Sequence, residues 1–84
     1  MARIKKADIE NAILDLNELM GYPTEPYNKE GSQPNNYHLY EAYGGHALHQ
    51  IVKGGGSMTI FGLTTKRELF EQIRSYISGI QVTK

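Results

Sequence analysis

Residues 37–62 read YHLYEAYGGHALHQIVKGGGSMTIFG and decide the fold of this chain of 84 residues. Strand-forming side chains alternate on both sides of Gly44-Gly45, a two-residue turn that supplies positive φ at both of its central positions. The triple glycine at 54–56 makes a second turn. The stretch therefore predicts two consecutive β-hairpins, which form a three-stranded antiparallel sheet.

The alternation assigns the side chains of this sheet to two faces. Closing the first hairpin at Gly44-Gly45 pairs Tyr40 with His49 across the strands. The first face is the natural core side and carries Tyr37, Leu39, Leu48, Val52, Met58 and Ile60. The second face carries His38, Tyr40, His49, Ile51, Thr59 and Phe61. A slip of one residue would exchange the faces of the third strand, so its register stays open.

Two amphipathic segments flank the sheet. In residues 6–20 the apolar positions recur at helical spacing, and Gly21 stands where a C′ glycine would close the helix. Residues 65–78 carry a second apolar stripe, and Thr65 and Glu68 fit a capping box at its start. Two helices can cover only one face of a three-stranded sheet. We therefore expect an α+β fold of order α-β-β-β-α, with both helices packed on one face.

These patterns also set the expected boundaries, which are a single domain over 1–84 with strands at about 37–43, 46–53 and 57–62. Residues 21–36, GYPTEPYNKEGSQPNN, contain all three prolines and no periodicity. Long connections of this kind are either functional or mobile. The segment is then a mobile surface loop, or one that Tyr22 and Tyr27 pack onto the body or onto a partner.

Composition excludes several functional classes. Nine basic residues balance nine acidic ones, so no overall field attracts polyanions. The absence of cysteine excludes a disulfide framework and fits a reducing compartment. The start MARIKK has no apolar signal region and no apolar run is long enough for a membrane span, so we expect a cytoplasmic protein without a membrane partner. A domain this small often gains stability by oligomerising, and we expect a homo-oligomer.

No catalytic or cofactor motif is present, so we expect neither an enzyme nor a cofactor. In the expected register His38 and His49 are diagonal neighbours and His46 points to the other face, and no metal site is expected. Lys66 and Arg67 open the second helix, where free N–H groups favour anions. They either contact a phosphate or are ordinary solvated residues.

The phrases LNELMGYPTEPY, NYHLYEAYGGHALHQI, GGG and TTKRELFEQIRSYISGI resemble a family of small bacteriophage and prophage proteins of unknown function. The resemblance implies a phage-encoded accessory protein in the cytoplasm of a bacterial host cell. Proteins of that sort are often counter-defence inhibitors or sequestering agents aimed at host enzymes or immune signals. The order of elements also resembles the double-stranded-RNA-binding domain, which implies RNA contacts at Gly44, Gly45, His46, Lys66 and Arg67.

The second face of the sheet is the most informative surface, because rings and imidazoles stand where Lys, Glu and Thr are usual. Three explanations remain: the register differs and part of the face is core, the face self-associates, or Tyr40, His49 and Phe61 stack on a flat base. We expect a non-enzymatic binding protein that self-associates and engages or sequesters a host protein or a small nucleotide-like ligand. The candidate contacts are Tyr40, His49, Phe61, His38 and Tyr27. The alternative is a nucleic-acid-binding module that uses Lys5, Lys6, Lys66 and Arg67 against phosphates.

Overall fold

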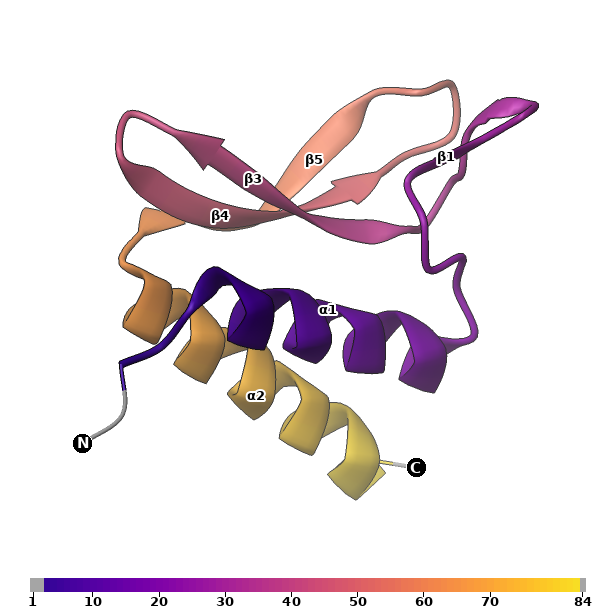
Figure 1. Ribbon diagram of the computed structural model, residues 1–84. Helices are drawn as coiled ribbons and strands as arrows, with labels where there is room; N and C mark the ends of the chain where they lie inside the picture. Colours follow the sequence, from indigo (N-terminus) through magenta and orange to yellow (C-terminus); the bar gives the residue numbers. More distant parts are fainter. Residues whose placement is uncertain (1–2, 84) are drawn as a thin grey trace.

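The computed structural model describes residues 3–83, which form two layers (Figure 1). One layer is an antiparallel sheet of three strands in the order β3 (Tyr37–Ala42), β4 (Gly45–Ile51) and β5 (Ser57–Thr64). The other layer holds both helices, α1 (Lys6–Met20) and α2 (Lys66–Thr83), which lie on the same side of the sheet. The expected α+β fold, with two helices on one face of a three-stranded meander, is confirmed.

The hydrophobic core lies between the helices and the sheet. Its fully or nearly buried members are Ile9, Ala12, Ile13, Leu16, Tyr37, Leu48, Leu69, Ile73 and Ile77. Complete burial of one aliphatic side chain stabilises a fold by about 1.5–3 kcal/mol, so the two helical stripes supply most of the stabilisation. Neither helix in residues 3–83 combines the length and the apolar character that crossing a membrane requires.

The first helix ends as its sequence predicts. Gly21 adopts the left-handed conformation at φ 73° and its N–H donates to the carbonyl of Glu18 at 3.2 Å. The next N–H, from Tyr22, donates to the carbonyl of Asn17 at 2.9 Å. Glycine reaches this φ without a steric penalty, so it closes the helix at the expected residue.

The second helix begins at half of the expected capping box. The Thr65 hydroxyl accepts a hydrogen bond from the N–H of Glu68 at 3.1 Å. The Glu68 carboxylate accepts its own hydrogen bond from the hydroxyl of Thr64. At its other end α2 runs to Thr83 and not to the expected residue 78. Gly79 lies inside the helix, where an isolated glycine is tolerated at a cost of about 1 kcal/mol relative to alanine.

Residues 21–36, for which no periodicity predicts a strand, contain a short hairpin of β1 (Tyr27–Asn28) and β2 (Gly31–Ser32). In Figure 1 this hairpin lies on the side of the sheet opposite the helices. Backbone hydrogen bonds join Asn35 and Asn36 to Ile51 at 2.7 and 2.9 Å. Ile51 is only 2% exposed, so this end of the second face is covered and the expectation that Ile51 lies uncovered is wrong.

Candidate ligand-binding face of the sheet

The turn between β3 and β4 differs from the expected one. Ala42 pairs with Gly45, which leaves Tyr43 and Gly44 as the two central turn residues. Both have positive φ, 52° and 75°, as a type I′ turn requires. The register is therefore shifted by two residues from the expectation. Because side chains alternate with a period of two, such a shift keeps every residue of β3 and β4 on its expected face.

The shift changes which side chains meet on the second face. His38 lies directly opposite His49, and not diagonal to it as the sequence suggested. Their rings meet edge to face, with centroids 5.9 Å apart and planes at 74°. Tyr40 is now the diagonal neighbour, and its ring stacks on His49 at 4.3 Å with the planes 8° apart. On the neighbouring strand β5, the hydroxyl of Thr59 lies 3.3 Å from Nε2 of His49.

These side chains surround one concave surface of about 660 Å³ on the face that the helices leave free. It is lined by Tyr27, His38, Tyr40, Ala47, His49, Ser57, Thr59, Gly62 and Leu63. Tyr27 comes from the β1–β2 hairpin and reaches the same surface as the β3 side chains. Four of the five candidate residues are thus brought together by the fold.

Several apolar groups on this surface remain in contact with solvent. Tyr27 is 66% exposed, Tyr40 42% and Leu63 46%. Exposed rings and aliphatic groups gathered at a concavity are typical of a ligand or partner site. The arrangement can stack a flat group and offer it hydroxyl and imidazole hydrogen-bonding partners.

The electrostatics of the surface are set by its two imidazoles. Burial lowers the pKa of His38 below its ordinary value of 6.5, and the nearby charge of His49 lowers it further. The backbone of Asn36 acts in the opposite direction. A lowered pKa keeps this ring neutral, so it can present one donor and one acceptor nitrogen. The lining contains no Lys, Arg, Asp or Glu side chain.

Phe61 does not belong to this surface, which corrects the expectation. Register shifts interrupt the β4–β5 ladder, so that Thr59 pairs with His49 but Phe61 pairs with Leu48. Between these two pairs β5 contains one additional residue, Ile60, which forms a β-bulge. The bulge turns the Phe61 ring to the helix side, where it meets Tyr76 of α2 edge to face at 5.8 Å. Leu63, beyond the bulge, takes a place on the free face that the sequence analysis did not assign to it.

The remaining histidine lies on the helix side of the sheet. His46 Nδ1 is 2.9 Å from a carboxylate oxygen of Glu41. Lys6 Nζ binds the other oxygen of the same carboxylate at 3.0 Å, and this contact lowers the pKa of Glu41 below its usual range. Residues 3–83 contain no group of three or more His, Asp or Glu side chains that could hold a metal ion.

The basic residues considered for phosphate contacts lie at the starts of the two helices. Lys5 and Lys6 lie at the start of α1, where Lys6 is paired with Glu41. Lys66 and Arg67 are exposed in the first turn of α2. The Glu68 carboxylate belongs to that same turn, and an acid there already complements the positive end of the helix dipole.

Comparison with protein-family models, with curated proteins and with solved structures gave no significant match to this chain.

Proposed function

We propose that this protein is a non-enzymatic binding module that takes a flat, nucleotide-like ligand on the free face of its sheet. The observation that supports the proposal is the convergence of Tyr27, His38, Tyr40 and His49 on one concave surface. Its volume of about 660 Å³ is within the range of about 300–1,000 Å³ that is usual for small-ligand sites. In the setting that the sequence resemblance implies, such a module would sequester a ligand or occupy a host protein.

Stacking would provide the main contact. Tyr40 and His49 already stack on each other, and Tyr40 keeps 42% of its surface exposed. Stacking of a base on an aromatic side chain contributes roughly 1–3 kcal/mol to the free energy of binding. Thr59 and Ser57 add hydroxyl groups at the edge of the same surface. These groups can form hydrogen bonds with the edge of a base, which gives orientation in addition to affinity.

The charge of the surface indicates which part of a nucleotide it would recognise. Its lining has no Lys or Arg side chain, so no fixed positive charge is available for a phosphate. We therefore expect recognition of the base, with the phosphate directed to solvent. Binding should then change little between about 50 and about 200 mM salt, whereas a nucleic-acid-binding module would weaken steeply over that range.

The test uses adenosine monophosphate as the probe and ribose 5-phosphate as its control without a base. In two-dimensional NMR spectra adenosine monophosphate should shift the amide signals around Tyr40 and His49 until the site is saturated. Ribose 5-phosphate should leave these signals unchanged. Tyr40→Thr keeps a strand-forming residue and should abolish the response. Tyr43→Asn removes a tyrosine that is 98% exposed in the turn, and should leave the response unchanged. Equal responses to the two probes would refute base recognition.

Self-association is a second use for the same surface, favoured by the exposure of Tyr27, Tyr40 and Leu63. Two copies could pack their free sheet faces together and bury these groups. Native mass spectrometry of the purified protein separates the two uses. A dimer that Tyr40→Thr dissociates and that adenosine monophosphate does not affect would replace the ligand proposal by self-association.

A further inference from the structure

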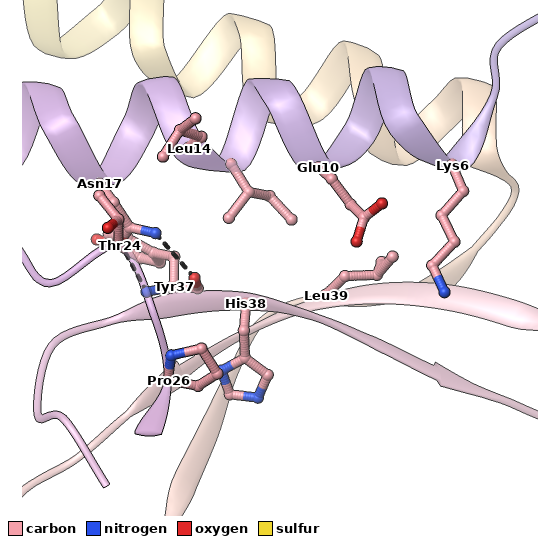
Figure 2. Close-up of a pocket in the computed structure, with 10 residues that line it drawn as sticks. Lys6, Glu10, Leu14, Asn17, Thr24, Pro26, Tyr37, His38 and Leu39 are labelled. Atoms are coloured by element: carbon pink, nitrogen blue, oxygen red, sulfur yellow. Dashed lines mark hydrogen bonds between the residues drawn. The ribbon is translucent and has the colours of Figure 1, made fainter. Parts of the chain in front are cut away.

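A groove of about 330 Å³ lies between α1 and the outer edge of β3, and it adjoins the surface described above through His38, which lines both (Figure 2). The helix contributes one stripe to its wall, and β3 and the loop before β1 contribute the rest. It is lined by Lys6, Glu10, Ile13, Leu14, Asn17, Thr24, Pro26, Tyr37, His38 and Leu39. The groove therefore follows a strand edge, and its occupant can reach backbone groups as well as side chains.

Asn17 shows how this edge binds an amide. Its side-chain Nδ2 donates to the carbonyl of Tyr37 at 3.0 Å, and the N–H of Tyr37 donates to its Oδ1 at 2.9 Å (Figure 2). The side chain is only 1% exposed and occupies the place that a peptide group of an adjacent strand would take. At Tyr37, the outward backbone groups of β3 are thus already hydrogen-bonded to a side-chain amide, which takes the place of a neighbouring strand.

The next two outward positions of β3 are open. In an antiparallel ladder the backbone groups of alternate residues point to opposite sides of the strand. Since those of Tyr37 point away from β4, the N–H and carbonyl groups of Leu39 and Glu41 do so too. Tyr37 forms two hydrogen bonds with Asn17, whereas within residues 3–83 the outward N–H and carbonyl groups of Leu39 and Glu41 have no hydrogen-bond partner.

The two edges of the sheet are not equivalent in this respect. Register shifts interrupt the pairing of β5 with β4, whereas β3 pairs with β4 in continuous register from Tyr37 to Ala42. Bulges twist an edge strand away from new partners, and regular edges accept them. β3 is consequently the edge of this sheet that is suited to an added strand.

The side chains along the groove select the chemistry of that strand. Ile13, Leu14 and Leu39 form an apolar section, and Leu14 is 41% exposed there. Beside it, Glu10 points from α1 toward Leu39 (Figure 2). Glu10 forms no ion pair in the described part of the chain, and the nearby Lys6 is occupied by Glu41. The groove therefore offers an apolar wall followed by a carboxylate that forms no direct ion pair and has only a longer-range electrostatic interaction with Lys6.

We propose that this groove binds an extended peptide by strand addition to β3, and that the peptide carries an aliphatic residue two positions from a Lys or Arg. Residues two apart share a face of a strand, so the aliphatic group would contact Leu14 and Leu39 while the cation meets Glu10. Main-chain hydrogen bonds to Leu39 and Glu41 would supply affinity, and the two side chains specificity.

The test is a set of short blocked peptides in which Val, Ile or Leu stands two positions before or after Lys or Arg, with Thr elsewhere. In hydrogen-exchange NMR the amides of Leu39 and Glu41 should gain protection on addition of a binding peptide. The amides of His38 and Tyr40 point toward β4 and are the internal control. N-methylation of the peptide nitrogen that faces the edge should weaken binding by about tenfold or more.

Two charge changes test the assigned chemistry. Replacing the cation of the peptide by Glu should weaken binding by about tenfold, because two carboxylates would then meet. Glu10→Gln should weaken binding of the cationic peptide by about threefold. The control is Glu18→Gln, which changes an exposed carboxylate of the same helix outside the groove and should have no effect on binding. Both positions are exposed, so both variants should fold.

The proposal is overturned if no peptide of the set binds at millimolar concentration, or if the shifts map to Tyr40 and His49 on the free face. It is also overturned if Leu39 and Glu41 become protected without peptide as the protein concentration rises, because a second copy would then occupy the edge. Failure of strand addition leaves base recognition at the free face to be decided by the adenosine monophosphate titration.

Discussion

The imidazole rings of His38 and His49 face each other directly across β3 and β4, with their centroids 5.9 Å apart. Two rings at this distance cannot both take up a proton without repulsion. Burial and this neighbour together hold the pKa of His38 below 6.5. The pair links the protonation of the free face to the stability of the fold.

Stability should therefore fall in mildly acidic solution. The unfolded chain takes up a proton at His38 more readily than the folded one, because the folded pKa is the lower of the two. The stabilisation is complete above about pH 6.5 and is lost as the pH falls through the folded pKa. Urea unfolding should show the decline, and His38→Gln, which cannot titrate, should flatten it. An equal slope in the variant would assign the decline to other groups.

The titration of His38 can be followed directly by NMR of its ring protons. Because the charge of His49 contributes to the lowered pKa, His49→Gln should raise the midpoint of His38 toward its ordinary value. Burial acts in the same direction as His49, so part of the shift should remain in this variant. A midpoint that does not move would show that the two rings are not electrostatically coupled.

Phe61 and Tyr40 should behave differently when each is replaced by alanine. The Phe61 ring packs against Tyr76 and the core, so Phe61→Ala should lower the free energy of unfolding by roughly 2 kcal/mol, somewhat less than the ~3–5 kcal/mol of a fully buried phenylalanine. Tyr40 is 42% exposed on the free face, and Tyr40→Ala should cost about 1 kcal/mol or less. Urea midpoints decide the order, and the reverse order would place Tyr40 in the core.

Asn17 should be among the residues on which folding depends most. Asn17→Leu keeps the approximate volume but leaves the buried N–H and carbonyl of Tyr37 without partners. We expect a loss of about 2–4 kcal/mol in the free energy of unfolding. Asn11 is exposed on the same helix, and Asn11→Leu is the matched control, with an expected change within about 0.5 kcal/mol. Equal effects would show that water replaces the amide of Asn17.

The turn offers a change that should stabilise the protein. Tyr43 has φ 52° and is 98% exposed, so its ring makes little contact and its backbone is strained. Tyr43→Asn supplies the Asn-Gly pair that type I′ turns prefer, and should raise the unfolding free energy by roughly 0.5–1 kcal/mol. Tyr43→Val should lower it, because a β-branched residue resists positive φ. A loss of stability in Tyr43→Asn would argue against this turn.

The sequence alone determined the elements and their layers. Helical spacing in residues 6–20, the alternation from Tyr37 onward and the capping pattern at Thr65 are local signals, each carried by neighbouring side chains. They specified both helices, the three long strands and the face that the helices cover. They also assigned His38, Tyr40 and His49 to the opposite face, since alternation is independent of a shift by two residues.

Tertiary structure decided the finer geometry. Gly44-Gly45 is the better turn by local preference, but the observed turn places Leu39 opposite Leu48, so that two apolar side chains meet directly on the helix side. Likewise no local pattern marks the bulge at Ile60, which moves Phe61 under α2 and leaves its place to Leu63. Register and bulges depend on packing between segments that are far apart in the sequence, and no local sequence pattern records the energy of that packing.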